Sequence, residues 1–156
     1  MGLAQSRSFH DFARKVRRKL GQLLGQRQIG DIWAGGVVSF TFDDFPKTAF
    51  TQGGAILERH GVRGTYYTAS KLVGTEGALG PLFDAEDLRA AHRNGHEIGC
   101  HTYSHLRCSE ADRPALVSEV RANAAGISAI LEGHIPKNFA FPYGATSPTA
   151  RHVMKR

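Results

Sequence analysis

"VSFTFDDFP", residues 38–46, decides the fold class that the rest of the chain must fit. Its first half is β-branched and aromatic, which predicts a strand over 37–42. The strand ends on two adjacent carboxylates, Asp43 and Asp44, which repel each other unless a cation lies beside them. An aspartate pair at a strand end is most often a turn or a helix cap, so it acquires a functional meaning only if other polar residues join it.

Beyond this strand, helix-like and strand-like patterns alternate along the chain. Apolar spacing, capping residues and terminal glycines predict helices at 48–60, where Thr48 is the expected N-cap, at 84–94 and at 110–132. Further strands are predicted at 62–69, 96–101 and 138–141. No candidate hairpin separates consecutive strands, so we expect an α/β fold with a parallel sheet of βαβ units, open or closed into a barrel.

Polar motifs follow three of the predicted strands. The aspartate pair follows the first, "HTYSH" (101–105) follows the third, and "PYG" (142–144) follows the fourth. Because the carboxyl ends of parallel strands meet at one side of the sheet, we expect these motifs to converge on one site.

The converging residues have the composition of a catalytic metal site. One aspartate with His101 and His105 makes three protein ligands, the set that leaves a coordination position open in catalytic zinc sites. The other aspartate is then available as a general base. "HTYSH" lacks the glutamate of the His-Glu-x-x-His metalloprotease motif, which removes that interpretation.

The remaining cysteines and histidines are expected to be structural or solvated. Cys100 precedes His101 on a strand and should face the opposite way, into the core. Together with Cys108 it is expected to be reduced. The other histidines have no partner at ligand spacing: His10, His60, His92, His96, His134 and His152.

The charge of the chain is concentrated at its N-terminus. Residues 1–30 hold seven basic side chains against one acidic side chain, and the rest of the chain carries thirteen of each. We therefore expect residues 1–34 to form a separate basic amphipathic segment, and the neutral body to bind no nucleic acid. The segment is expected to pack on the body rather than to lie on a membrane surface. No signal peptide or membrane span is evident, so the expected location is the cytoplasm.

Taken together, "FTFDDFP", "HTYSH" and "FAFPYG" resemble, in order and separation, the first three motifs of the polysaccharide deacetylase family, the NodB-homology domain. The similarity runs over 37–148, within a domain that we place at 35–156. The resemblance implies a distorted (β/α) barrel and metal-dependent removal of N- or O-acetyl groups from carbohydrate, such as a chitooligosaccharide or a related polysaccharide. Zinc is the metal expected for this ligand set, with cobalt, nickel or manganese as alternatives.

The same resemblance implies roles for individual residues. Asp43 matches the general base, while Asp44, His101 and His105 match the metal ligands. Tyr143 matches the residue whose backbone N–H stabilises the oxyanion of the tetrahedral intermediate.

Three departures from the family pattern affect these expectations. Phe45 stands where the family usually has glycine, and we expect it to crowd or line the mouth of the site. Ala140 stands where many members have an arginine that tunes the base. Finally, the chain stops at Arg156, so we expect only the first four β/α units of a truncated barrel without its late histidine general acid. His152 is a poor substitute for that acid. The alternative is therefore a catalytically impaired metal- or carbohydrate-binding remnant of a deacetylase.

Overall fold

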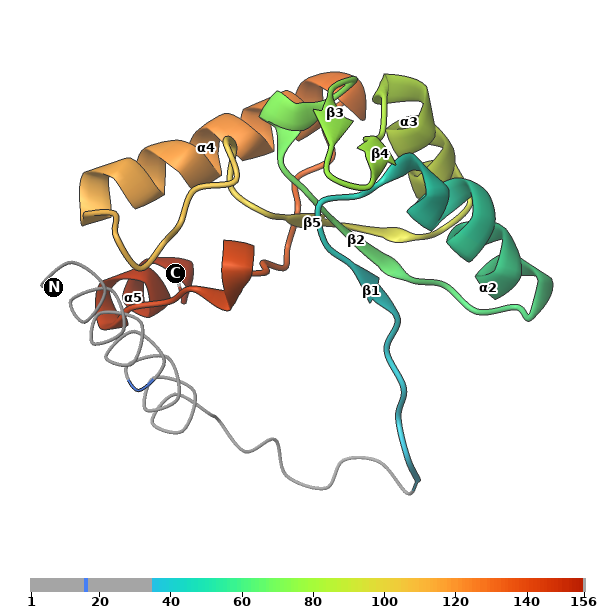
Figure 1. The fold of residues 1–156 in the computed structure, drawn as a ribbon, viewed down its shortest axis with the longest axis horizontal. Helices are drawn as coiled ribbons and strands as arrows, with labels where there is room; N and C mark the ends of the chain where they lie inside the picture. The colour runs from blue at the N-terminus through green and yellow to red at the C-terminus, as the bar shows by residue number, and fades with distance from the viewer. Residues whose placement is uncertain (1–15, 17–34, 156) are drawn as a thin grey trace, which may run out of the picture.

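A parallel three-stranded sheet forms the centre of the molecule (Figure 1). The computed structural model describes Val16 and residues 35–155, so the predicted amphipathic segment lies almost entirely outside the described residues. The strands are ordered β1-β2-β5, with Thr41 opposite Thr65 and Thr65 opposite Glu97. Their bounds are Thr41–Phe42 for β1, Thr65–Thr68 for β2 and Glu97–Cys100 for β5. The parallel α/β architecture predicted from the sequence is confirmed.

The predicted strands are shorter in the structure than in the sequence pattern. Residues 35–39 run away from the sheet, whereas the Phe40 carbonyl still accepts from the Thr65 N–H at 2.9 Å; Val37 and Val38 are 67% and 76% exposed. The predicted strand at 138–141 is reduced to one parallel bridge between Phe139 and Cys100. This segment lies beside β5, and Pro142, which has no N–H to donate, follows it directly.

A hairpin between the 3-10 helix η2 (Ser70–Leu72), which follows β2, and the helix at 85–93 contradicts the expectation that no hairpin separates consecutive strands. It pairs β3 (Glu76–Gly77) with β4 (Gly80–Pro81) in antiparallel fashion. Gly80 has a φ of +103°, a conformation that favours glycine. Strands of two residues are too short to show a period-two pattern, which is why the sequence did not indicate them.

The helix predicted at 48–60 forms, but its first half is a π-helix and only its second half is an α-helix. A π-helical segment, η1 (Ala49–Gly54), continues into α2 (Ala55–Arg59), and Thr48 makes no side-chain cap, so its predicted capping role is wrong. A Cβ atom at Gly54 would lie 2.8 Å from the Tyr66 hydroxyl. The segment therefore approaches the sheet more closely than any other residue type at this position would allow.

Helices α3 (Ala85–Arg93) and α4 (Arg113–Ile130) contribute apolar side chains to the core that covers the sheet. Leu88 of α3 and Ile127 of α4 are fully buried in one cluster with Tyr66 and Ile98 of the strands. A second cluster joins α4 to α5 (Pro148–Met154) through Leu116 and Ala150, among other residues. In residues 35–155, no helix combines the length and the apolarity that crossing a bilayer needs.

The N-terminus of α3 is tied to the loop that follows β1. Asp84 caps the helix in a capping box with Asp87. Lys47 donates to both carboxylates, at 2.7 Å each. A single cation therefore joins the loop of the aspartate pair to a helix about forty residues further on.

Acidification is expected to weaken this attachment. Lys47, and then the backbone N–H of Asp87, lower the pKa of Asp84 from 3.8 to about 2 by hydrogen bonding. As the pH falls, Asp84 is therefore protonated in the unfolded chain before it is protonated in the folded protein. The contribution of the Lys47–Asp84 pair to the free energy of unfolding is complete above about pH 4 and is lost as the pH falls towards about 2. The Lys47 and Asp84 side chains are 38% and 46% exposed, so the effect is modest.

Thermal unfolding at a series of acidic pH values tests this attachment. The loss of Tm on acidification should be smaller in Lys47→Met than in the unmodified protein. Lys71→Met, which removes an exposed lysine elsewhere, should leave the acid dependence unchanged. Equal acid dependence in Lys47→Met and the unmodified protein would show that the pair contributes nothing.

Candidate metal centre

In the loop after β1, three consecutive side chains differ in burial because the backbone makes a left-handed turn. Asp44 and Phe45 both adopt positive φ, at 60° and 45°. The backbone therefore turns sharply directly after Asp43. Asp43 is exposed, Asp44 is half-buried, and Phe45 is fully buried. The turn therefore leaves the two neighbouring carboxylates in different surroundings, with Asp43 exposed and Asp44 half-buried.

Phe45 belongs to the core and does not line the site, which corrects the expectation from the sequence. Its ring stacks on Phe83, with centroids 4.7 Å apart, and lies 4.5 Å from the Tyr66 ring. The reason is the left-handed turn, which directs the side chain inwards.

Replacing Phe45 with glycine is expected to destabilise the fold by about 2–4 kcal/mol. Loss of a fully buried aromatic ring costs about 3–5 kcal/mol, and glycine recovers about 1 kcal/mol because it tolerates the positive φ. Urea unfolding measures the difference. Phe45→Leu, which retains most of the apolar volume, should lose less stability. A Phe45→Gly protein as stable as the unmodified one would be inconsistent with the buried position.

Asp44, His101 and His105 come together at the carboxyl edge of the sheet, as the sequence predicted. Each offers a ligand atom, and these atoms all lie within 4.8 Å of one another. The Oδ1 atom of Asp44 is 2.8 Å from Nε2 of His105 and 3.5 Å from Nε2 of His101.

The donor atoms are arranged as a cation would require. Asp44 Oδ1 is buried, yet within the described part of the chain it has no hydrogen-bond partner, although His105 Nε2 is close by. A buried acceptor without a partner is costly, and a cation shared with the two imidazoles would satisfy it. The residues therefore fit a divalent metal ion.

His101 is held in the orientation and protonation state of a ligand. Its Nδ1 atom lies 3.0 Å from the Ala140 carbonyl oxygen, which can only accept, so Nδ1 carries the proton and Nε2 is left with its lone pair. The ring is 1% exposed. Burial lowers the pKa of His101, despite the opposing charge of the nearby Asp43, and so favours the neutral imidazole that binds metals.

The loop that carries His105 is fixed by residues that the sequence did not single out. Glu119 of α4 accepts two hydrogen bonds of 2.8 Å from the backbone N–H and the hydroxyl of Ser104. Asn123, one turn further along α4, is fully buried and donates to the Thr68 carbonyl at the end of β2. Both residues occupy ordinary positions in a helical pattern, so no sequence signal distinguishes them.

Tyr143 packs against His105. Its φ is 59°, and its ring centroid is 4.4 Å from that of His105. The Arg107 guanidinium lies 4.3 Å from the centroid of the same ring. Tyr143 nevertheless remains 56% exposed. The structure thus brings Tyr143 to the site, with its ring packed on a candidate ligand.

Asp43 faces a pocket that adjoins the metal centre. The pocket has a volume of about 540 Å³ and is lined by Asp43, Ala140, Phe141, Gly144, Thr146, Arg151, Met154 and Lys155. Ala140, whose carbonyl orients His101, forms part of the wall shared with the metal centre. His152 is exposed on α5 and is not among the lining residues.

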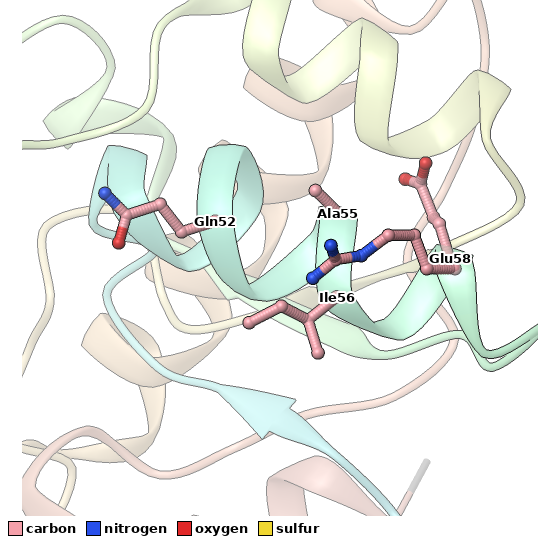
Figure 2. A pocket seen from close by; sticks show the side chains of 5 residues that line it. Gln52, Ala55, Ile56 and Glu58 are labelled. Atoms are coloured by element: carbon pink, nitrogen blue, oxygen red, sulfur yellow. The ribbon is translucent and has the colours of Figure 1, made fainter.

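A second surface hollow, of about 680 Å³, lies away from this chemistry. Figure 2 shows its lining side chains along η1 and α2, and the set is Gln52, Ala55, Ile56, Glu58 and Arg59. None of these residues belongs to the metal cluster or to the Asp43 pocket. The hollow is therefore not the candidate site.

Of the other histidines in the described chain, His60 and His152 are exposed, and the rest, like both cysteines, have structural contacts. His96 is buried; its Nδ1 accepts from the Gly64 N–H and its Nε2 contacts Glu58 at 2.9 Å. His92 and His134 have ring centroids 4.5 Å apart. Both cysteines are buried and free, and Cys100 contacts Asn123, so the predicted core position is confirmed.

Fold and site together define an α/β protein with an Asp-His-His candidate metal centre at the carboxyl edge of its parallel sheet. The chain belongs to the polysaccharide deacetylase family, whose model matches residues 34–156. The family resemblance inferred from the three sequence motifs is confirmed.

Two fungal proteins are among the relatives. The chain is 27% identical over 123 residues to a chitin deacetylase of Arthroderma benhamiae, covering 76% of this chain and 31% of that protein. It is 28% identical over 109 residues to a chitin deacetylase of Colletotrichum lindemuthianum, covering 69% and 42%. The chain thus spans less than half of the length of these relatives.

Solved structures share the fold. A family 4 carbohydrate esterase from Streptomyces lividans in complex with acetate superposes with a TM-score of 0.64 at 26% identity, over 78% of this chain and 58% of that one. A family 4 acetyl xylan esterase from Clostridium thermocellum in complex with a cobalt ion gives a TM-score of 0.60 at 25% identity, over 76% and 54%.

Proposed function

We propose that this protein is a metal-dependent hydrolase that removes acetyl groups from N-acetylated carbohydrate. The observation that carries the proposal is the buried Oδ1 of Asp44, which has no hydrogen-bond partner among the residues that the structure describes and lies near two imidazoles. The neighbouring carboxylate, Asp43, faces a pocket. Family membership supports the same reaction class. The names of the fungal relatives favour a polymer or oligomer of N-acetylglucosamine as the substrate.

Asp44, His101 and His105 are the residues that would hold the metal. Their donor set of one carboxylate and two imidazoles suits zinc, and it also accepts cobalt, nickel or manganese. A cobalt ion is bound in the acetyl xylan esterase, which supports this range. When bound, the ion supplies a Lewis acid that polarises an acetyl carbonyl and makes water a better nucleophile.

Asp43 is the proposed general base. It is exposed to the pocket, where an acetylated sugar and a water molecule can approach, whereas Asp44 is turned towards the histidines. The carboxylate accepts a proton from the water as the water oxygen adds to the carbonyl carbon. The bond from the carbonyl carbon to the sugar nitrogen or oxygen then breaks, and that atom takes the proton that Asp43 accepted, which gives acetate and a free amine or hydroxyl and regenerates the carboxylate of Asp43.

Tyr143 is proposed to stabilise the charge that develops on the carbonyl oxygen, through its backbone N–H. The contact between its ring and that of His105 supports this role, because it brings Tyr143 next to a candidate ligand. The ring contact also limits how far the loop can move, so the donor would be held in position before the reaction begins.

Acetate release from N-acetylglucosamine oligomers, measured with zinc-loaded protein, tests the proposal. We expect one acetate for each amine that appears. An O-acetylated xylan oligomer provides a second substrate, because an alkoxide leaves more readily than an amide nitrogen and depends less on a proton donor. Stoichiometric zinc binding without acetate from either substrate would instead identify a binding remnant.

A further inference from the structure

The backbone at Tyr143 has a conformation that residues other than glycine rarely adopt. Its φ is 59°, in the left-handed region. The Gly144 N–H closes the turn around it by donating to the Phe141 carbonyl at 2.9 Å, and this bond does not use the Tyr143 N–H. Because the conformation is unfavourable for a residue with a side chain, it persists only where the surroundings hold it.

The Tyr143 ring makes two contacts that can hold it. One is with the His105 ring, at 4.4 Å between centroids. The other is with the Arg107 guanidinium, which lies over the ring at 4.3 Å from its centroid, well within the reach of about 6 Å of a cation–π interaction. Only 34% of the Arg107 side chain is exposed, so this cation packs on the protein surface instead of extending into solvent.

Arg107 is carried by a part of the chain that is itself fixed. The next residue, Cys108, is fully buried in the cluster that joins α4 to α5. The preceding residue, Leu106, donates its N–H to the Thr102 hydroxyl at 2.8 Å. The acid nearest to the guanidinium, Glu110, is 68% exposed and lies 3.5 Å from Nε, so this ion pair contributes little. The contact with the Tyr143 ring is therefore the main interaction of the guanidinium.

We propose that Arg107 is a positioning residue, which holds Tyr143 in its left-handed conformation and so keeps the backbone N–H ready for the developing oxyanion. The inference rests on the proposed function, in which this N–H is the donor. The residues that line the pocket beside Asp43 do not include Arg107, so its action is on Tyr143 and not on the sugar. A donor to the oxyanion contributes about 10²–10³ in kcat, so the fraction of molecules in which it is correctly placed affects the rate directly.

Arg107→Met, which keeps the length of the side chain without its charge, should lower kcat by about 2–5-fold, the shift that an exposed cation–π contact can produce. KM should stay within about twofold, because the donor acts in the transition state. Zinc affinity should also stay within about twofold. Arg107→Lys, which restores a cation, should recover part of the loss. Arg121→Gln, which removes an exposed cation from α4, is the matched control and should keep the original kcat.

A double-mutant cycle with Tyr143→Leu tests whether Arg107 acts through the ring. Leucine retains the backbone N–H but has no aromatic face, so adding Arg107→Met to this variant should cause no further loss of kcat. Relaxation of the Tyr143 backbone amide, measured by nuclear magnetic resonance on zinc-loaded protein, gives a readout that needs no turnover. The amide should be rigid in the unmodified protein and distinctly more mobile in Arg107→Met.

An unchanged kcat in Arg107→Met, an equally rigid amide, or additive losses in the double variant would overturn the inference. These outcomes are separable from failure of the proposed function. A protein that releases no acetate, but whose Tyr143 amide becomes mobile in Arg107→Met, would support the role of Arg107 in holding Tyr143 and contradict the deacetylase. Acetate release with an amide that is equally rigid in both proteins would do the opposite.

Discussion

Asp43→Asn is expected to lower the rate of acetate release by about 10²–10⁴-fold, the usual contribution of a general base. The amide has nearly the same shape as the carboxylate but cannot accept the proton of the attacking water. Because Asp43 is exposed and the cluster of candidate ligands consists of Asp44, His101 and His105, the zinc affinity should stay within a few-fold of the original. The two assays together separate the role of a base from that of a ligand.

The matched control for this substitution is Asp112→Asn. Asp112 caps α4 by accepting from the Ala115 N–H, and asparagine caps a helix about as well as aspartate. Its activity should therefore be unchanged. If Asp43→Asn retains full activity, or loses its zinc together with its activity, the assignment of the base is wrong.

Loss of a histidine ligand is expected to have the second large effect. His105→Ala should weaken zinc binding by more than about 100-fold, because even residues that only orient ligands account for about 10–100-fold. Acetate release should disappear at zinc concentrations that saturate the unmodified protein. His105 is the better of the two histidines to replace, since its side chain is 16% exposed whereas that of His101 is 1% exposed and fills the core.

Thermal shift provides an independent measurement for the same variant. Zinc that binds only the folded state should raise the Tm of the unmodified protein and leave that of His105→Ala unchanged. His152→Ala, an exposed histidine on α5, should behave as the unmodified protein does. A full complement of zinc in His105→Ala would rule out this residue as a ligand.

The convergence of the site was predictable because it depends on topology alone. In a parallel sheet the carboxyl ends of the strands share an edge, so motifs that follow different strands must meet there. Asp44, His101 and His105 meet for this reason, and the alternation of residues along β5 correctly placed Cys100 in the core.

What the sequence did not predict depends on individual backbone angles and long-range contacts. The orientation of Phe45 follows from two consecutive residues with positive φ, which a pattern of residue types does not encode. The support that Glu119 gives to the His105 loop depends on how α4 packs against that loop after the helix has formed. Likewise, the hairpin within 76–81 consists of strands too short to be recognised.

The most direct test of the account is a titration of metal-free protein with zinc, following acetate release from an N-acetylglucosamine oligomer. The account predicts no acetate before zinc is added, a linear rise in rate, and a plateau at one zinc ion per chain. It also predicts that His105→Ala shows no such rise. Acetate release by the metal-free protein, or a fully occupied zinc site that releases no acetate, would contradict it.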